Sequence, residues 1–339
     1  MADRVLVTGG TGFVGGHLLR ALISSGRSVV ALDINPPDRF FPVEADFIQG
    51  DMCDRATVMA AARGCDVVVA NGALVPITQA GAAEFMRVNA GGTRNTLGVA
   101  AAYDAYGVYV SSSAIFGVPV ANPLPADAPM APYEDYGRSK AAGERAVRDL
   151  RSRGLVAASL RPRTLVGAGR LGLFEMIFER VRGNKRVPIF GNGCNSVQLV
   201  DADDYAAALV AAIDRRAPGD YNIGARDFGT VREDLEGLIL AVGSTSQLQP
   251  LPVPLVKGAL RSAAALRLSP FTAWHWGSAA SDFYFEIDHA ENELGWSPQK
   301  SNAEALVDAY RVHISGPREG GGSAHRKPLS RLVGKMLRA

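Results

Sequence analysis

The chain has 339 residues, 47% of them hydrophobic and 21% charged, which is typical of a packed globular protein with room for a nucleotide-binding domain and a smaller lobe. The formal net charge of +2 gives no reason to expect nucleic acid as a partner, and the spacing of three cysteines and five histidines indicates free thiols and no metal site. Because the sequence shows neither a signal-peptide layout nor a run of about 18 apolar residues, we expect a cytoplasmic protein.

Short apolar runs alternate with longer amphipathic segments in the first half of the chain. Strands are expected at residues 5–7, 29–32, 47–48, 67–69 and 108–110, and helices at 12–25, 56–63 and 84–103. Continuous β-branched runs separated by helices are typical of a parallel sheet that is covered on both faces. The pattern therefore predicts a doubly wound α/β fold, in which ligands bind at the carboxyl ends of the strands.

The second half begins with a long helix over residues 136–153 and a strand over 156–161 that ends at Pro162. The alternation then becomes irregular, with helices expected at 171–182, 203–213, 230–242 and 303–314 and an extended segment at 197–200. We therefore expect a nucleotide-binding domain over residues 1–165, to which segments around 197–225 return. Residues 166–315 would form mainly a substrate-binding lobe.

The last residues, 316–339, differ in composition from the rest of the chain. Gly320-Gly321-Gly322-Ser323 is typical of a flexible linker, and the apolar residues beyond it recur at helical spacing among basic residues. This basic amphipathic tail fits weak contact with an anionic membrane surface, docking on the protein itself, or disorder.

A glycine-rich turn joins the first predicted strand to the first predicted helix. Gly9 permits a tight turn, Gly12 lets the backbone approach a pyrophosphate, and Gly15 allows close packing of helix on strand. The free N–H groups and the dipole at the start of the helix favour the anion. The turn therefore predicts a bound dinucleotide, with these residues as its neighbours: Gly9, Thr11, Gly12, Phe13, Val14 and Gly15.

Asp33 ends the second predicted strand and is followed by Ile34 and Asn35. A carboxylate at this place accepts hydrogen bonds from both ribose hydroxyls of NAD and repels the 2′-phosphate of NADP. The alternative is a carboxylate that only caps the turn before Pro36. We expect the first role, with NAD as the cofactor and with Asp33, Ile34 and Asn35 beside it.

Tyr136 and Lys140 are four residues apart on a predicted helix and therefore share one face. Tyrosine ordinarily ionises at about pH 10, and an ammonium close by stabilises the phenolate and lowers that pKa. Lys140 can also hold the nicotinamide ribose, while Tyr136 removes the proton of a substrate hydroxyl as hydride leaves the carbon. The alternative is an exposed pair on a solvated face.

Several ordered motifs of the chain resemble those of the extended short-chain dehydrogenase/reductase family, in its NAD-dependent epimerase/dehydratase branch. The resemblance covers most of residues 4–315 and implies a Rossmann-type sheet with a smaller C-terminal substrate lobe. It also implies a homodimer through two long helices, here 81–103 and 136–153. The motifs are Thr8–Gly15, Gly50-Asp51, Asn71-Gly72-Ala73, Asn89-x-x-Gly92-Thr93, Ser111–Gly117, Tyr136-Gly137-Arg138-Ser139-Lys140 and Arg161-Pro162.

The resemblance implies further roles in cofactor and substrate binding. The family's catalytic hydroxyl, counted back from Gly117, falls on Ser112, which would bind the substrate oxygen and steady its developing charge. The implied cofactor neighbours are Asp51 and Met52 at the adenine, Gly72 and Ala73 along the middle, Asn89 beside the ribose and nicotinamide end, and Pro162 at the nicotinamide. Ser111 is expected as a further neighbour of the cofactor.

At several positions the sequence differs from the family's motifs, and these differences reduce the number of reactions and substrates that we expect. The dehydratases carry an Asp-Glu pair after the catalytic hydroxyl, and Ser113 and Ala114 stand there instead, so dehydration is not expected. Two residues that reach substrate phosphate in other members are matched by Val197 and Thr164, which weakens the case for a sugar nucleotide. Arg163, Arg170 or Arg182 could supply a positive charge in place of the missing phosphate contacts. The alternative is that these three residues are ordinary surface arginines.

Three functions are compatible with these residues. The first is an NAD-dependent epimerase or oxidoreductase that acts on a hydroxyl carbon of a sugar or sugar nucleotide, with Ser112, Tyr136 and Lys140 as catalytic residues. The second is an NAD-dependent dehydrogenase or reductase of a hydrophobic, steroid-like or polyketide-like alcohol or ketone. The third is a cofactor-sensing binding protein, against which the intact catalytic residues argue.

Overall fold

The computed structural model describes residues 3–39, 41–78, 80–169, 173–254, 258 and 281–315. The expected basic tail at 316–339 lies outside the described residues. In the described part of the chain, no helix is both long enough and apolar enough to cross a bilayer.

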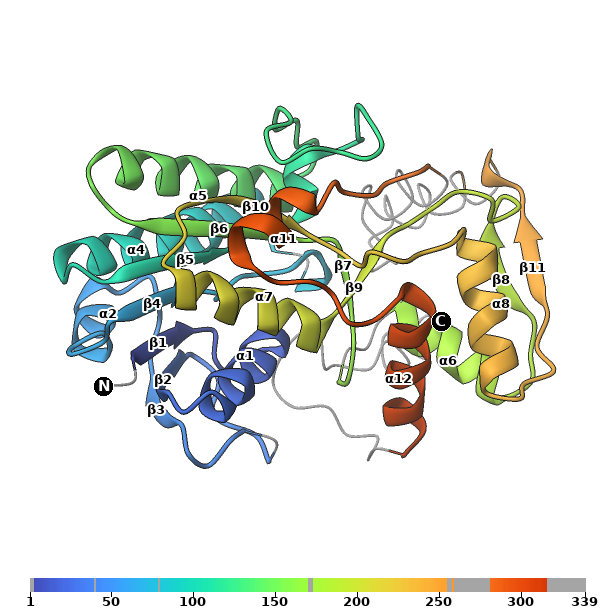
Figure 1. Cartoon of the computed structure of the whole chain (residues 1–339), viewed down its shortest axis with the longest axis horizontal. Coiled ribbons are helices and arrows are strands. Elements are labelled where there is room, and N and C mark those ends of the chain that lie inside the picture. Colours follow the sequence, from blue (N-terminus) through green and yellow to red (C-terminus); the bar gives the residue numbers. More distant parts are fainter. Residues whose placement is uncertain are drawn as a thin grey trace.

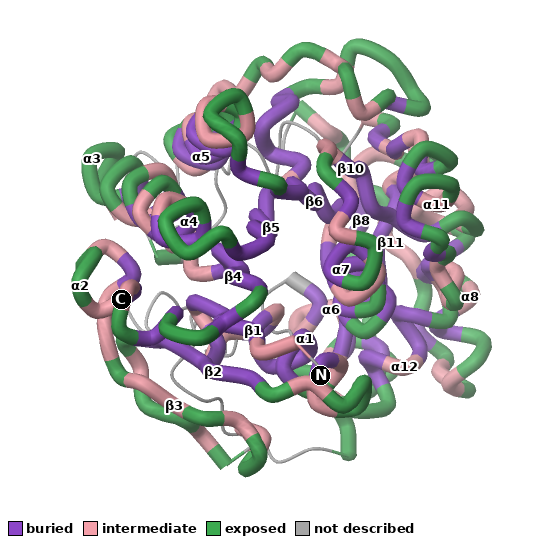
Figure 2. The backbone as a smooth tube through the Cα atoms, turned by 60° about the vertical axis from the view of Figure 1, so that its left-hand side comes forward, coloured by how far each residue is buried: buried purple, intermediate pink, exposed green. Residues whose placement is uncertain are grey.

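Seven parallel strands form the central sheet, in the order β10-β6-β5-β4-β1-β2-β3 (Figure 1). The interior strands β4, β5 and β6 are buried along their whole length, as their continuous apolar runs require (Figure 2). The predicted α/β fold with a doubly wound, Rossmann-type sheet is confirmed. The bounds are β1 Arg4–Thr8, β2 Ser28–Asp33, β3 Asp46–Gln49, β4 Val67–Ala70, β5 Tyr106–Val110, β6 Ala157–Pro162 and β10 Gly219–Ile223.

Helices cover both faces of this sheet (Figure 1). On one face, α1 (Phe13–Ser24) packs against α7 (Ala202–Arg215). On the other face lie α2 (Arg55–Ala61), α4 (Thr93–Ala102) and α5 (Asp135–Ser152). Two apolar cores result, one on each side of the strands.

The segment expected as one helix over residues 84–103 is divided. Helix α3 (Ala82–Phe85) continues into a π-helical stretch, η2 (Met86–Gly92), before α4 begins. The wider turn holds Asn89, whose buried side-chain amide bonds to the backbone of Leu74 and to the hydroxyl of Ser139. Because these partners are distant in the sequence, apolar spacing contains no sign of the wider turn.

A smaller lobe contains α6 (Leu173–Arg182), α8 (Val231–Ala241) and α12 (Asn302–Ser315) around a core of its own (Figure 1). The sequence does not predict several short elements, because segments of three to seven residues contain too few positions to show a period. These elements are β7 (Thr164–Val166), β8 (Val187–Phe190), β11 (Leu248–Leu251), which pairs with β8, and α11 (Asp288–Leu294). Strand β7 pairs with β9 (Leu199–Asp201), which overlaps the extended segment expected at 197–200.

A buried ion pair joins β6 to α5 near the carboxyl end of the sheet. Arg161 and Glu144 are both fully buried, and Nε and Nη2 of the guanidinium donate to the two carboxylate oxygens at 2.7 and 2.5 Å. Nη2 also contacts Asp220 of β10 at 2.9 Å. Burial by itself lowers the pKa of Arg161, but the two carboxylates outweigh it and raise that pKa overall. Arg161 therefore stays charged, and its contacts link β6, α5 and β10.

Arg161→Met should lower the free energy of unfolding by about 3–5 kcal/mol, because it leaves the buried carboxylate of Glu144 without its counter-charge. Arg148→Met is the matched control, since Arg148 also pairs with Asp220 but has a side chain that is 48% exposed. Its loss should cost less than about 1 kcal/mol. Urea unfolding measures both variants, and equal losses would show that Arg161 contributes no more than a surface ion pair.

Candidate active site

The glycine-rich turn between β1 and α1 has the shape that a dinucleotide requires. Gly9 has a φ of +68°, and a Cβ there would lie 2.6 Å from the Cα of Gly72. Helix α1 follows Gly12, which supplies no side-chain cap. Among the described residues, only the carbonyl of Gly9 lies within 4 Å of a Cβ added at Gly12. The start of α1 therefore offers free N–H groups and space for a pyrophosphate.

Phe13 and Val14 belong to this turn through their backbone only. The side chain of Phe13 is 2% exposed and packs edge-on against His17, with ring centroids 5.1 Å apart. Val14 packs against the same apolar core. If these two residues contact the cofactor, they do so through their backbone N–H groups, as expected for a helix start that binds an anion.

The carboxylate of Asp33, at the end of β2, faces the glycine-rich turn. One oxygen accepts a hydrogen bond from the N–H of Thr11 at 3.1 Å, and the other accepts from the N–H of Asn35 at 2.9 Å. Asp33 thus stabilises its own turn and also reaches the segment that opens α1. Its neighbour Ile34 is 60% exposed. This place fits the predicted contact with the adenosine ribose.

Asp51 and Met52 follow β3 and lie near the same turn. Met52 is 7% exposed and packs on two glycines, because a Cβ at Gly72 would lie 2.5 Å from its sulfur and one at Gly92 2.9 Å from its methyl group. The carboxylate of Asp51 accepts a hydrogen bond from the N–H of Cys53 at 2.9 Å. The side chain of Met52 thus packs directly against Gly72, whose backbone stays partly exposed.

Two predicted cofactor neighbours have their polar groups bound to other parts of the protein. The amide of Asn89 bonds to Leu74 and Ser139, and the hydroxyl of Ser111 donates to Glu144 at 2.6 Å. These groups therefore support the framework of the site, and their contact with the cofactor stays a prediction. The same holds for half-buried Gly72 and Ala73 after β4 and for buried Pro162 at the end of β6.

Gly137 allows the start of α5 to approach the loop after β5. A Cβ at Gly137 would lie 2.5 Å from the carbonyl oxygen of Ala114. Gly137 directly follows Tyr136, and Ala114 is two residues after Ser112. The structure therefore brings the predicted base and the predicted hydroxyl to adjoining segments, although the sequence separates them.

Lys140 is held at the carboxyl end of β5. Its ammonium donates to the carbonyl of Val110, the last residue of β5, at 2.7 Å, and the residue is 2% exposed. Burial lowers its pKa to about 7, against a smaller upward influence of the Glu144 carboxylate. In the protein without cofactor, Lys140 is therefore near the midpoint of its titration at neutral pH, rather than fully charged as the sequence argument assumes.

Tyr136 and Ser112 complete the group. Tyr136 is half-buried in the first turn of α5, and its ring lies edge-on to Phe85 at a centroid distance of 6.1 Å. Ser112 is half-buried and caps the short turn η3 (Ser113–Phe116), so that its oxygen accepts from the N–H of Ala114 at 3.2 Å. That bond leaves the hydroxyl proton of Ser112 available for a substrate oxygen.

Glu144 is a residue of this site that the sequence analysis missed. Its carboxylate accepts from Ser111 and Arg161 and raises the pKa of Lys140, four residues earlier on α5. The sequence did contain a signal for Glu144, because it lies on the same helix face as Tyr136 and Lys140. A carboxylate on a buried helix face is seldom without a charged partner, so a nearby cation could have been expected. Within the described residues, no group of three or more His, Cys, Asp or Glu side chains is placed to hold a metal ion.

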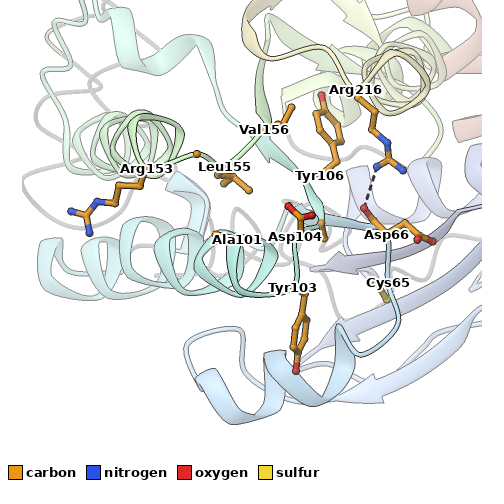
Figure 3. A pocket seen from close by; sticks show the side chains of 12 residues that line it. Cys65, Asp66, Ala101, Tyr103, Asp104, Tyr106, Arg153, Leu155, Val156 and Arg216 are labelled. Atoms are coloured by element: carbon orange, nitrogen blue, oxygen red, sulfur yellow. Dashed lines mark hydrogen bonds between the residues drawn. The ribbon is translucent and has the colours of Figure 1, made fainter.

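A hollow of about 570 Å³ lies away from these residues, at the amino ends of β4, β5 and β6 (Figure 3). Its lining includes Tyr106, Leu155 and Arg216, and Arg216 donates to the carbonyl of Asp66 at 3.1 Å. Because a doubly wound sheet binds its ligands at the carboxyl ends of the strands, this hollow is not the site of the chemistry.

A comparison with family models supports this geometry. Residues 5–224 match the model described as the NAD dependent epimerase/dehydratase family. The chain belongs to this family. The resemblance inferred from the ordered motifs is thereby confirmed, and so is NAD as the cofactor.

Several known proteins and solved structures resemble the chain over most of its length. The uncharacterized protein y4nG of Sinorhizobium fredii is 37% identical over 98% of this chain and 85% of its own. A 2-alkyl-3-oxoalkanoate reductase of Stenotrophomonas maltophilia is 27% identical over 89% of this chain and 97% of its own. The structure of a UDP-glucose-4-epimerase from Stenotrophomonas maltophila, with bound NAD and formylated UDP-arabinopyranose, has a TM-score of 0.77 at 22% identity, covering 92% of this chain and 98% of that chain.

Asp33→Asn should weaken NAD binding about tenfold more than NADP binding, because the amide oxygen keeps one of the two hydrogen bonds from the turn, whereas the negative charge that favours a ribose without a 2′-phosphate is lost. Fluorescence titration with each reduced cofactor gives the two dissociation constants. Asp54→Asn, at the cap of α2, is the control. Equal weakening of both cofactors in Asp33→Asn would show that this carboxylate does not read the ribose.

Lys140→Met should reveal the lowered pKa of Lys140 through the pH dependence of stability. The folded protein has a pKa of about 7 at this residue, against an ordinary value of 10.5, so the unfolded chain binds more protons between these values and stability rises with pH across that window. The free energy of unfolding of the wild type, relative to Lys140→Met, should therefore rise by up to about 1.4 kcal/mol per pH unit above neutrality. Urea unfolding at several pH values measures it, and a constant difference would show that Lys140 keeps its proton.

Proposed function

We propose that the chain moves hydride on and off a hydroxyl-bearing carbon of a sugar or sugar nucleotide, with Tyr136 as the base. The observation that carries this proposal is the placement of Lys140. Its hydrogen bond to Val110 joins the helix face that bears Tyr136 to the strand whose end leads into Ser112. This contact supports a site in which the base, the hydrogen-bond donor and the cation lie at the carboxyl end of β5, where this fold binds ligands.

The residues of the dinucleotide-binding half fit NAD. The uncapped start of α1 suits its pyrophosphate, and Asp33 suits its adenosine ribose. When bound there, NAD supplies the acceptor for the hydride that leaves the substrate carbon. A protonated Lys140 suits the hydroxyls of the second ribose, and the same charge stabilises the phenolate of Tyr136.

Ser112 and Tyr136 act on the same substrate oxygen in this proposal. The hydroxyl of Ser112 donates a hydrogen bond to that oxygen, and the phenolate of Tyr136 removes its proton, so the C–O bond becomes a carbonyl as hydride departs. Return of hydride to the opposite face of the carbonyl carbon inverts the centre. If hydride does not return, the outcome is net oxidation. The first outcome is an epimerisation and the second a dehydrogenation.

A second candidate function is net oxidation or reduction of a less polar hydroxy or oxo acid. One observation favours it: Arg163 is buried beside Ser113 and carries a positive charge close to the candidate catalytic residues. The name of the 2-alkyl-3-oxoalkanoate reductase describes an oxo group near a carboxylate, which supports such a substrate. The replacement of two phosphate-contacting residues by Val197 and Thr164 points in the same direction.

Tyr136→Phe should reduce turnover by about 10²–10⁴-fold, because it removes the proton acceptor, and should leave NADH binding nearly unchanged. A panel of sugars, sugar nucleotides and hydroxy acids, read by NADH absorbance and product mass, measures turnover. In that panel an epimerase gives an isomer without net NADH, whereas a dehydrogenase accumulates NADH. Tyr103→Phe, at the exposed end of α4, is the control. Unchanged turnover of Tyr136→Phe would refute the assigned base.

A further inference from the structure

Arg163 is a buried cation beside the candidate catalytic residues. It directly follows Pro162 at the carboxyl end of β6 and is 3% exposed. Its Nη1 donates to the hydroxyl of Ser113 at 3.1 Å, and Ser113 is the next residue along the chain from Ser112. The guanidinium is thus linked, through a single hydroxyl, to the residue adjoining the proposed substrate-binding serine.

The partners of this guanidinium are uncharged. Nε donates to the carbonyl of Phe283 at 3.2 Å. The rings of Phe283 and Phe285 have centroids 3.9 and 5.8 Å from Cζ, so aromatic carbon shields one side of the cation. Among the described residues, no carboxylate lies within ion-pair distance of Arg163, and its Nη2 has no hydrogen-bond acceptor. One terminal nitrogen therefore has no acceptor within the described part of the chain.

Arg161, two residues earlier on the same strand, provides an internal comparison. Both arginines are buried, but Arg161 has two carboxylate partners, Glu144 and Asp220, that raise its pKa. Burial lowers the pKa of Arg163 to about 9. A buried charge without a counter-charge is unfavourable, so an anion that reaches Arg163 gains an interaction that the fold leaves unmade.

We propose that Arg163 binds a carboxylate of the substrate, close to the hydroxyl-bearing carbon that reacts. This assignment rests on the proposed function, because the nearness of Arg163 to the reacting carbon follows from the role of Ser112. A planar guanidinium with a free terminal nitrogen suits a carboxylate in both charge and shape. The substrate class is therefore a hydroxy acid, and its chemical sources are a hexuronic acid sugar and a 3-hydroxyalkanoate.

A different role for Arg163 leads to different results. If it only clamps the backbone of Phe283 to Ser113, its loss lowers stability and weakens the binding of acidic and neutral ligands alike. If it recognises a carboxylate, its loss selectively weakens acidic ligands. The charge of the ligand, rather than the size of the total effect, therefore distinguishes the two roles.

The test measures binding to NAD-loaded Tyr136→Phe protein, in which the chemical step is blocked, by isothermal titration. The ligands are two matched pairs: 3-hydroxydecanoate with its methyl ester, and glucuronate with glucose. With Arg163 present, one acid should bind about 10- to 100-fold more tightly than its neutral partner. Arg163→Gln should abolish that preference, and Arg163→Lys, which keeps the charge, should retain part of it.

The ligand pair in which the acid binds more tightly than its neutral partner identifies the source of the carboxylate, a hydroxyalkanoate or a hexuronic acid. Equal binding of acid and neutral partner in both pairs overturns the proposal, and so does a preference that survives in Arg163→Gln. If Arg163→Gln fails to fold, a preference in Arg163→Lys as large as that of the parent protein overturns it, because Lys has no planar terminal nitrogen in the place of Nη2. Titration requires no turnover, so its result stands apart from the test of Tyr136 as base.

Discussion

The buried ammonium of Lys140 is the interaction on which the candidate site depends. It is bonded to the last carbonyl of β5 and lies one helical turn from the carboxylate of Glu144. Removing an ammonium from water is costly, and here the cost is only partly offset, which lowers its pKa to about 7. The same contact fixes α5 against the end of β5, the strand that leads into Ser112.

Charges of alternating sign extend from this lysine across the sheet. Glu144 faces Arg161, and Arg161 faces Asp220 on β10, so that two of the buried cations near the site have carboxylates associated with them. Arg163 departs from this arrangement, because its partners are a hydroxyl, a backbone carbonyl and two aromatic rings. Arg161 thus uses its charge to stabilise the fold, whereas we propose that the charge of Arg163 is available to a ligand.

The sequence predicted the features that depend on neighbours in the chain. The glycine-rich turn, the carboxylate of Asp33 at the end of its strand, and the four-residue spacing of Tyr136 and Lys140 are local patterns, and continuous apolar runs separated by helices sufficed for the doubly wound sheet. Local geometry restricts each of these features, so a single chain without its fold already contains them. The role of Ser112 came from the family resemblance instead, and it stays a prediction.

Only the tertiary structure decided what those residues contact. Lys140 and Val110 are 30 residues apart, and Arg163 and Phe283 are 120 apart. Neither pairing leaves a periodic signal, nor does the commitment of Asn89 to the backbone of Leu74 within a π-helical turn. Burial and charge compensation belong to the packed molecule, since both depend on which distant segments exclude water from a group. The sequence therefore determined which chemical groups are present, and the fold determined which of them are buried and which groups they contact.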